Sequence, residues 1–364
     1  MRTINVDLGE RSYAVHVGRG LIEKLPELIS RRSTGPDPSG RCAVLLTDDR
    51  VGNLYGDAVE KILVEKFGRT LTIGLSSGET SKSLAVMSNV LERMAEERVR
   101  RTDVLVALGG GVVCDVGGFA GSIYQRGIDV VNVPTSLLSQ VDAAIGGKTG
   151  INLSAGKNLA GSFHQPKAVI CDVVLLESLS AADFRSGMAE VAKYGFCFDP
   201  EMLQTLAGAS AGDTDEMERL VARSVEHKAR LVEIDEFDRG ERNKLNYGHT
   251  LGHALEAYGG YERWSHGEAI SIGMVFAAAL SEETGTASSN LIDKHREALG
   301  EIGLPVAAEF DPERVKGFLQ IDKKHSVPGG TLRWVLLEDL GRAVMKSDVD
   351  EAAIDSALKK VMSK

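Results

Sequence analysis

Short hydrophobic runs alternate with longer amphipathic segments through the first half of the chain. Patterns typical of buried strands occur at residues 42–47, 71–75, 103–108, 130–133 and 168–171. Helical periodicity occupies residues 51–67 and 81–98. Alternation of strands and helices predicts a largely parallel sheet covered by helices. We therefore expect an N-terminal α/β domain, which opens with a strand-like alternation directly after Met1.

From residue 180 onward the pattern becomes mostly helical. Helices are predicted at residues 180–194, 216–233, 268–284 and 289–302, with one short strand at 332–337. Ser180 and Asp183 predict the N-terminal cap of the first of these helices, and Gly195 its end. The change of pattern predicts an α/β domain over residues 1–175 and an all-α domain over residues 176–364. The Gly- and Pro-rich segment 33–40 is interpreted as a surface connection.

Composition narrows the class of protein. The hydrophobic fraction of 43% and charged fraction of 26% are those of an ordinary globular protein. A net charge of -10 argues against a nucleic-acid binder. The four Cys are scattered without a Cys-x-x-Cys pair, which is typical of small buried residues in a reducing compartment. With no signal segment and no apolar run near the ~20 residues of a membrane span, we expect a cytoplasmic protein.

Three of the eight His residues lie in one short region of the chain. His249 and His253 are one helical turn apart on a predicted helix, and His266 follows a Gly-rich break. Imidazole is the commonest metal ligand, and a catalytic zinc takes three protein ligands plus an open position. Thr250 stands where a His-Glu-x-x-His protease carries its general base, so peptide hydrolysis of that kind is disfavoured. The pattern predicts a metal site rather than ordinary polar His residues.

Two Gly-rich regions are candidates for anion binding. Gly109-Gly110-Gly111 follows a predicted strand and opens a helix, where backbone N–H groups can approach a phosphate. It is not a Gly-x-Gly-x-x-Gly fingerprint, and a tight strand-to-helix turn explains it equally well. Further on, Lys148 and Lys157 lie in Gly-rich surroundings near Asp142 and Asn158. This second set predicts an anion pocket carried by loops.

Two acid–base pairs are separated by three residues. Glu79 and Lys82 follow a turn, where a helix cap with a solvated Lys is the simple interpretation. Glu190 and Lys193 lie on a helix of mostly small, apolar residues. A surface ion pair is the default interpretation there and contributes well under ~1 kcal/mol. The apolar neighbours instead indicate a partly buried face, where an unpaired charge is costly unless it has a role.

Taken together, these motifs resemble the 3-dehydroquinate synthase family across nearly the whole chain. The motifs are Gly109-Gly110-Gly111, Val133-Pro134-Thr135-Ser136, Gly147-Lys148-Thr149-Gly150, Gly156-Lys157-Asn158, Ala189-Glu190-Val191-Ala192-Lys193 and His249-Thr250-Leu251-Gly252-His253. The resemblance implies a homodimer with an NAD-binding α/β domain and a helical domain that binds metal and substrate. It also implies zinc, cobalt or another divalent metal, and a small sugar phosphate as substrate.

The resemblance assigns roles to individual residues. The metal would be held by Glu190, His249 and His266, which moves His253 from the metal to the substrate. NAD would contact Asp48, Glu79, Lys82, Gly109, Gly110, Gly111, Asp115 and Thr135. The catalytic residues at the substrate would be Lys148, Lys193, Lys228, Arg242, Asn246 and His253. Further substrate contacts would come from Arg126, Asp142, Lys157, Asn158 and Lys324, with Arg126 reaching into the neighbouring subunit's site.

The implied reaction converts 3-deoxy-D-arabino-heptulosonate 7-phosphate to 3-dehydroquinate and phosphate, as a carbon–oxygen lyase of the shikimate pathway to aromatic amino acids. It comprises transient oxidation by NAD, phosphate elimination, reduction and intramolecular aldol closure.

Three alternatives remain open. Lys228, Arg242 and Asn246 favour a substrate with a carboxylate, so among other sugar phosphate cyclases an amino-dehydroquinate synthase is the main rival. A metal-dependent polyol dehydrogenase would not need phosphate-binding residues such as Lys148 and Lys157. A non-catalytic relative would lack a ligand or a cation, and every position is filled.

Overall fold

The computed structural model describes residues 1–29, 40–288, 290–326 and 332–363, without the side chains of residues 320–326. Its contacts divide the chain into two compact units, residues 1–179 with 210–237 and residues 180–209 with 238–364. This division differs from the expected break after residue 175. Helix α8 (Thr214–Ile234) lies in the first unit, because its long apolar face packs against β1 (Arg2–Val6) and β2 (Tyr13–Gly18).

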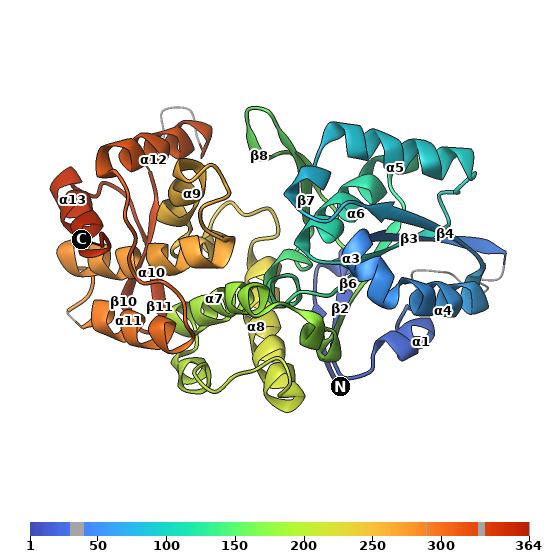
Figure 1. Ribbon diagram of the computed structural model, residues 1–364, viewed down its shortest axis with the longest axis horizontal. Helices are drawn as coiled ribbons and strands as arrows, with labels where there is room; N and C mark the ends of the chain where they lie inside the picture. Colours follow the sequence, from blue (N-terminus) through green and yellow to red (C-terminus); the bar gives the residue numbers. More distant parts are fainter. Residues whose placement is uncertain (30–39, 289, 327–331, 364) are drawn as a thin grey trace. The chain divides into compact units, whose positions relative to one another are not determined.

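A seven-stranded sheet of order β1-β2-β9-β6-β5-β3-β4 forms the centre of the first unit (Figure 1). Its remaining strands are β3 (Arg41–Asp48), β4 (Gly68–Leu75), β5 (Val104–Gly109), β6 (Asp129–Pro134) and β9 (Ala168–Asp172). Strands β2 to β6 and β9 pair in parallel, and β1 joins β2 antiparallel. All five predicted strands are confirmed. Strand β5 is buried along its whole length, as a parallel strand covered on both faces requires.

Helices cover both faces of this sheet. Residues of α5 (Leu84–Glu96) and α6 (Gly111–Ile123) pack in one hydrophobic cluster, and residues of α1 (Leu25–Leu28) and α4 (Asp57–Phe67) pack in another. Strand β3 supplies Val44 and Leu46 to the first cluster and Ala43 and Leu45 to the second, because successive side chains of a strand point to opposite faces. The predicted helices at 51–67 and 81–98 are confirmed, the former being extended at its start by α3 (Asp49–Val51) and the π-helix η3 (Gly52–Gly56).

Residues 148–163 form a hairpin of β7 (Lys148–Leu153) and β8 (Gly156–Phe163), where loops were predicted. The prediction was wrong because this Gly-rich segment has little of the alternating hydrophobicity that marks a strand. Short helical turns complete the unit. They are η1 (Gly9–Arg11), η2 (Ile22–Lys24), η4 (Glu79–Ser81), η5 (Tyr124–Arg126), η6 (Ser139–Ala143) and η7 (Val173–Ser178).

The second unit is built around the long buried helix α10 (His266–Glu283). Around it pack α7 (Ala181–Cys197), α9 (His249–Tyr258), α11 (Leu291–Glu301), α13 (Glu351–Lys360) and β10 (Trp334–Asp339). The unit also contains η8 (Pro200–Thr205), η9 (Glu241–Asn246), α12 (Pro312–Ser326) and β11 (Arg342–Lys346). The four predicted helices and the late strand are confirmed, whereas α12, α13 and β11 were not predicted.

The two ends of helix α7 test two local predictions. Ser180 caps the start, since its hydroxyl accepts the N–H of Asp183 at 3.1 Å. Gly195 does not end the helix, which continues to Cys197. A Cβ on Gly195 would lie 2.5 Å from Leu203 Cδ2, so the glycine serves close packing against η8 rather than termination.

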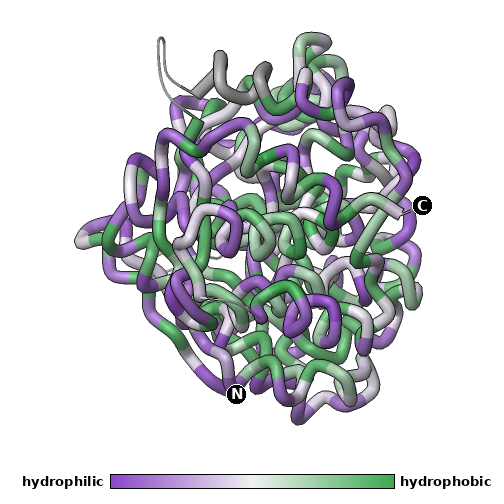
Figure 2. Tube along the Cα trace, turned by 90° about the vertical axis from the view of Figure 1, so that its left-hand side faces the viewer, coloured by the Kyte–Doolittle hydropathy of each residue, from purple (hydrophilic) through white to green (hydrophobic). Residues whose placement is uncertain are grey.

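Hydrophobic and hydrophilic stretches alternate along the trace (Figure 2). The four Cys are free and buried, as their scatter in the sequence predicts. Among the described residues, no helix combines the length and apolar character needed to span a bilayer.

Candidate active site

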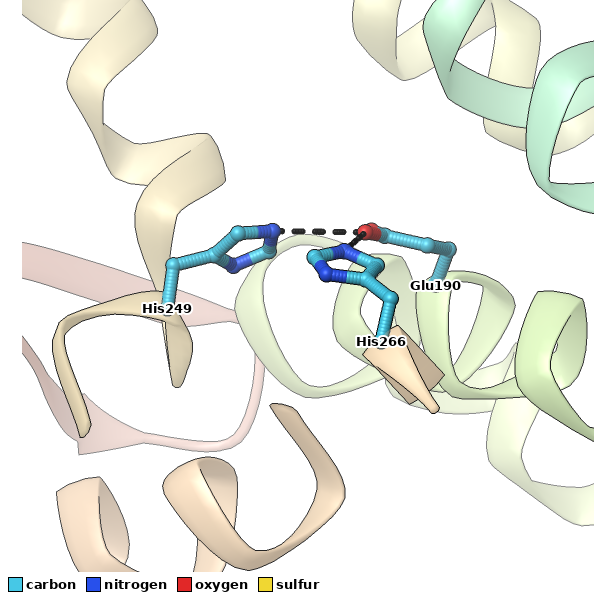
Figure 3. Close-up of side chains that lie close together, drawn as sticks. All are labelled: Glu190, His249 and His266. Carbon is cyan, nitrogen blue, oxygen red and sulfur yellow. Dashed lines mark hydrogen bonds and ion pairs between the residues drawn. The ribbon is translucent and has the colours of Figure 1, made fainter. Parts of the chain in front are cut away.

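A carboxylate and two imidazoles meet in the second unit (Figure 3). They belong to Glu190 on α7, His249 at the start of α9 and His266 at the start of α10. Glu190 Oε1 lies 3.3 Å from His249 Nε2 and 3.2 Å from His266 Nε2. One ligand atom from each residue lies within 4.8 Å of the others. The cluster therefore offers an oxygen and two nitrogens to a single point.

A capping box fixes His266 at the first position of α10. The Ser265 hydroxyl accepts the N–H of Glu268, and the Glu268 carboxylate accepts the N–H of Ser265 at 2.8 Å. This reciprocal pair satisfies backbone donors that would otherwise be unpaired at the helix start. The helix cannot slide by a residue without losing both bonds, so the side chain of His266 is directed reproducibly.

Two glycines let α10 approach its neighbours closely enough for the cluster to form. A Cβ on Gly267 would lie 2.3 Å from Ser186 Cα, so the start of α10 lies directly against α7. A Cβ on Gly273 would lie 1.9 Å from the carbonyl oxygen of Gly248, so α10 also lies against the start of α9. Because any side chain at either position would push the helices apart, these glycines set the spacing of the three candidate ligands.

Hydrogen bonds at Nδ1 turn the Nε2 atom of each imidazole toward Glu190. His249 Nδ1 lies 3.1 Å from the carbonyl oxygen of Tyr247, which can only accept, so this nitrogen carries the proton. His266 Nδ1 lies 3.4 Å from Glu256 Oε2. In both cases Nε2 is the nitrogen left for a metal, which is how a second contact selects the ligating atom.

Glu190 is buried and ionised. Its other oxygen, Oε2, lies 2.6 Å from Lys193 Nζ, and both side chains are only 1% exposed, so the surface ion pair is ruled out. Burial alone would raise the pKa of Glu190, but Lys193 and the imidazole of His249 outweigh it and hold that pKa well below its ordinary value. Burial likewise lowers the pKa of His266, while Glu190 and Glu256 raise it to about 10. Glu190 itself is therefore held in its negatively charged form.

His253 lies one turn beyond His249 and is exposed. Its ring centroid is 5.4 Å from that of His249 and 6.3 Å from that of His266. It belongs to a second group, with Glu256 and His266, whose ligand atoms also lie within 4.8 Å of one another. A set made of all three His residues is not among the groups that the described part of the chain brings together.

In the first unit, the residues expected at NAD follow the carboxyl ends of four adjacent parallel strands. Asp48 ends β3, Glu79 and Lys82 follow β4, Gly109 ends β5, and Thr135 follows β6. From β3 the chain proceeds to β4 on one side and returns to β5 on the other. The strand order therefore reverses between β3 and β5, and in open α/β sheets ligands bind at such a reversal.

The turn after β5 leads into the start of α6, where the first backbone N–H groups have no partner within the helix. Gly110 is the N-cap of α6, with no side chain to cover the helix start. The N–H of Thr135 donates to the carbonyl oxygen of Gly109 at 2.9 Å, which ties this turn to the end of β6. A helix N-terminus with small residues favours a phosphate.

A polar network surrounds Lys82, which is only 5% exposed. Its Nζ donates to Asp115 Oδ2 at 2.6 Å and to the side-chain oxygen of Asn158. Asn152 donates to Glu79 at 2.8 Å and accepts the N–H of Asn158 at 2.8 Å. Burial raises the pKa of Asp115 to about 6, although Lys82 acts in the opposite direction. The solvated Lys expected here is therefore a buried one.

The other predicted substrate residues divide between the units. Lys228 on α8 is buried and pairs with Asp142, donating to its carbonyl oxygen at 2.6 Å. Lys148 and Lys157 lie on the β7–β8 hairpin. Four further predicted residues are placed as follows: Arg126 is exposed at the end of η5, Arg242 is buried in η9, Asn246 ends η9, and the side chain of Lys324 lies outside the described residues.

Two polar residues at these clusters were not predicted. Glu256 follows His249 by seven residues, and its helical spacing could have indicated a shared face with the His pair. Asn152 carried no comparable signal, because its contacts depend on the hairpin.

The comparisons with known proteins cover the whole chain. A family model described as 3-dehydroquinate synthase N-terminal matches residues 72–186, and one described as 3-dehydroquinate synthase C-terminal matches residues 187–325. The curated 3-dehydroquinate synthase of Azotobacter vinelandii is 40% identical over 98% of this chain and 96% of its own length. That of Symbiobacterium thermophilum is 41% identical over 96% of this chain and 98% of its own.

Solved structures share the fold. A 2-deoxy-scyllo-inosose synthase complexed with carbaglucose-6-phosphate, NAD⁺ and Co²⁺ matches with a TM-score of 0.88 at 23% identity, covering 99% of this chain and 100% of its own. The 2-epi-5-epi-valiolone synthase of Streptomyces hygroscopicus subsp. jinggangensis, with NAD⁺ and Zn²⁺ bound, matches with a TM-score of 0.85 at 24% identity over 96% of each chain. The two family models and the full-length relatives at about 40% identity show that the chain belongs to the 3-dehydroquinate synthase family of phosphate-eliminating, ring-forming lyases.

Proposed function

We propose that this chain converts 3-deoxy-D-arabino-heptulosonate 7-phosphate to 3-dehydroquinate and phosphate in the shikimate pathway, with NAD and a divalent metal as cofactors. The observation that carries the proposal is the Glu190–His249–His266 cluster, in a chain whose full-length relatives are 3-dehydroquinate synthases. The polar edge at β3 and β5 supports the nucleotide part of the proposal.

The residues of the cluster suit a divalent metal. Two Nε2 atoms and a carboxylate oxygen are a donor set of catalytic zinc sites, with a further position left for substrate. The ionised Glu190 supplies the negative charge that a cation requires. When bound, the metal supplies Lewis-acid polarisation of substrate oxygens. Glu190, His249 and His266 would hold it, and zinc or cobalt satisfies this mixed set.

The carboxyl edge of the first sheet suits NAD. The turn at residues 109–111 leaves backbone N–H groups for the pyrophosphate, and Asp48 lies across the strand reversal from it. Glu79, Lys82, Asp115 and Thr135 would complete the pocket. When bound, NAD supplies a hydride acceptor that becomes the hydride donor of a later step.

The chain's own cations would bind and orient a polyanionic substrate. Lys193 and Arg242 are buried in the second unit, and Lys228 is buried in the first. Charge-assisted hydrogen bonds from such groups hold carboxylate and phosphate in one geometry. His253 is exposed beside the metal cluster, where an imidazole can move a proton at a substrate oxygen.

The direct test supplies the purified protein with zinc, the heptulosonate phosphate and a catalytic amount of NAD. We expect phosphate and 3-dehydroquinate to form together, without net NADH, and a chelator to stop both. Folded, metal-loaded protein that forms neither product would refute the proposal.

The same assay distinguishes the proposed activity from two alternatives. An amino-dehydroquinate synthase would turn over the amino analogue in preference to the heptulosonate phosphate. A polyol dehydrogenase would accumulate NADH with a simple polyol and release no phosphate. The dehydrogenase fold is represented by a butanol dehydrogenase of Thermotoga maritima at a TM-score of 0.66 and 14% identity, well below the cyclases.

We also propose a homodimer in the cytoplasm. Exposed Arg126 would reach the neighbouring subunit's site, so mixing an R126A chain with a chain inactivated at its own metal site should restore part of the activity. Absence of any restoration would argue against a shared site.

A further inference from the structure

We propose that Glu256 is a positioning residue for His266: its carboxylate accepts the Nδ1 proton, so that Nε2 of the same ring is held toward the metal. This inference rests on the proposed function, because it assumes an ion at Glu190, His249 and His266. Glu256 was not among the residues predicted from the sequence, and its proposed role comes from its contact with His266.

The contact joins two helices through one imidazole. Glu256 Oε2 lies 3.4 Å from His266 Nδ1, and Glu190 Oε1 lies 3.2 Å from His266 Nε2 on the opposite side of the ring. The ring of His266 is therefore held between two carboxylates, one at each nitrogen. A ring flip would put a carbon atom in place of each nitrogen and break both contacts.

The burial of Glu256 indicates that its carboxylate has a role in this arrangement. Glu256 is only 6% exposed, although it lies on a helix with free access to solvent one turn earlier, at His253. A carboxylate is withdrawn from water at a substantial free-energy cost unless hydrogen bonds compensate it. An imidazole N–H is such a donor, and a carboxylate on the far nitrogen of a ligating His both orients the ring and raises its basicity.

The other imidazole provides an internal comparison. His249 Nδ1 meets the carbonyl oxygen of Tyr247, a neutral acceptor that no side-chain substitution removes. His266 Nδ1 meets a charged side chain that can be replaced. Both rings thus direct Nε2 toward Glu190, one through a backbone acceptor and the other through a side chain. Only the acceptor of His266 can be removed by mutation.

The same contact decides between two possible metal positions. His253, Glu256 and His266 could also surround an ion, and Nδ1 is the nitrogen of His266 that faces Glu256. A nitrogen that donates its proton to Glu256 has no lone pair for a metal. The geometry therefore predicts a single tight ion, on the Glu190 side of the ring.

The test measures zinc affinity by competition with a chromophoric chelator, on metal-free full-length protein without substrate. The variants are E256A, E256Q and the control E262Q, which changes an exposed carboxylate in the connection between α9 and α10. We expect E256A to weaken zinc binding roughly 10- to 100-fold, the usual effect of losing such a partner. E256Q keeps an acceptor and should recover part of this loss, and E262Q should bind zinc like the parent protein.

The cobalt-loaded protein provides a second readout. Its visible spectrum should change in E256A, because the ring of His266 is no longer held, and should remain unchanged in E262Q. If E256A does not fold, E256L decides, because it fills the same space without an acceptor, and the parent's zinc affinity and cobalt spectrum in E256L would overturn the inference.

The results that would contradict the inference can be distinguished from those that would refute the proposed function. Parent-like zinc affinity in a folded E256A would overturn the positioning role. Two tight ions in the parent, with one lost in E256A, would overturn it too, because Glu256 would then be a ligand. A parent protein that binds no zinc would instead refute the proposed function.

Discussion

Each unit of the chain buries a lysine against a carboxylate, and the two pairs behave in opposite ways. Lys82 and Asp115 in the first unit lie 2.6 Å apart, as do Lys193 and Glu190 in the second. Yet the pKa of Asp115 is raised to about 6, while that of Glu190 is held well below its ordinary value. Distance to a lysine does not decide the charge state of a buried carboxylate.

The difference lies in the other partners. Glu190 faces the imidazoles of His249 and His266 in addition to Lys193. Lys82, by contrast, is shared between Asp115, Glu79 and Asn158. Glu190 is thus held in its ionised form, which suits a resident cation, whereas Asp115 gains or loses its proton near pH 6.

The largest effect on activity is expected from neutralising the carboxylate of Glu190. E190Q should lower kcat at saturating zinc on the order of 10³-fold, since loss of several kcal/mol of metal-based stabilisation corresponds to such a factor. E262Q is the matched control and should retain full activity. An E190Q enzyme with more than a tenth of the parent's kcat would show that Glu190 is not needed at the metal.

The pH dependence of stability should differ between the two carboxylates. Asp115 has a raised pKa, so its contribution to stability is present below about pH 4 and is lost as the pH rises through about 6. The free energy of unfolding of D115N, relative to the parent without ligands, should therefore increase by up to about 3 kcal/mol from pH 4 to pH 7. Glu190 should act oppositely and lose its contribution as the pH falls. Urea titrations across this range measure both, and a pH-independent D115N difference would contradict the account.

A smaller effect is expected from a buried neutral group of the second unit. Burial lowers the pKa of His295 to about 3, and its ring contacts the Tyr247 hydroxyl at 2.8 Å. Because the unfolded chain takes up a proton below about pH 6.5, this stability is present above that pH and lost as the pH falls. The loss at pH 5 should be about 2 kcal/mol. In urea titrations, H295Q should be less stable than the parent at pH 8 but should not show this acid-dependent loss. A pH dependence of stability equal to the parent's would contradict the expectation.

The smallest effect is expected from Lys82. K82M should fold, because Asp115 can take up a proton in place of the lost charge, and should weaken NAD binding about tenfold, the effect of one charged hydrogen bond. Zinc affinity should not change. Calorimetric titration with NAD measures the effect, with exposed K61M as control. Equal NAD affinity in K82M and K61M would remove Lys82 from the pocket.

The sequence predicted those parts of the fold that leave a local hydrophobic pattern. Strand β5 could be recognised because burial on both faces produces an unbroken apolar run. The hairpin β7–β8 could not, since Gly150 and Gly161 pair across it without any alternation of side chains. Helix α8 has an ordinary amphipathic pattern. Such a pattern predicts a helix but does not indicate that its apolar face packs on the first unit.

The candidate site was predictable only in part for the same reason. Spacing within one helix could indicate His249 and His253, whereas Glu190 reaches the site from a helix far away in sequence. Its place as a metal ligand was implied by the family resemblance alone. The contact of Glu256 with His266 could not be predicted, because the burial and orientation of both side chains depend on the crossing of α9 and α10.

The most direct test of the metal centre is a crystal structure of the zinc-loaded protein with diffraction recorded at the zinc absorption edge. The account predicts one strong anomalous peak per chain, roughly 2.0–2.2 Å from a Glu190 oxygen and from Nε2 of His249 and His266. A peak bound instead by His253, Glu256 and Nδ1 of His266, or by none of these residues, would contradict it.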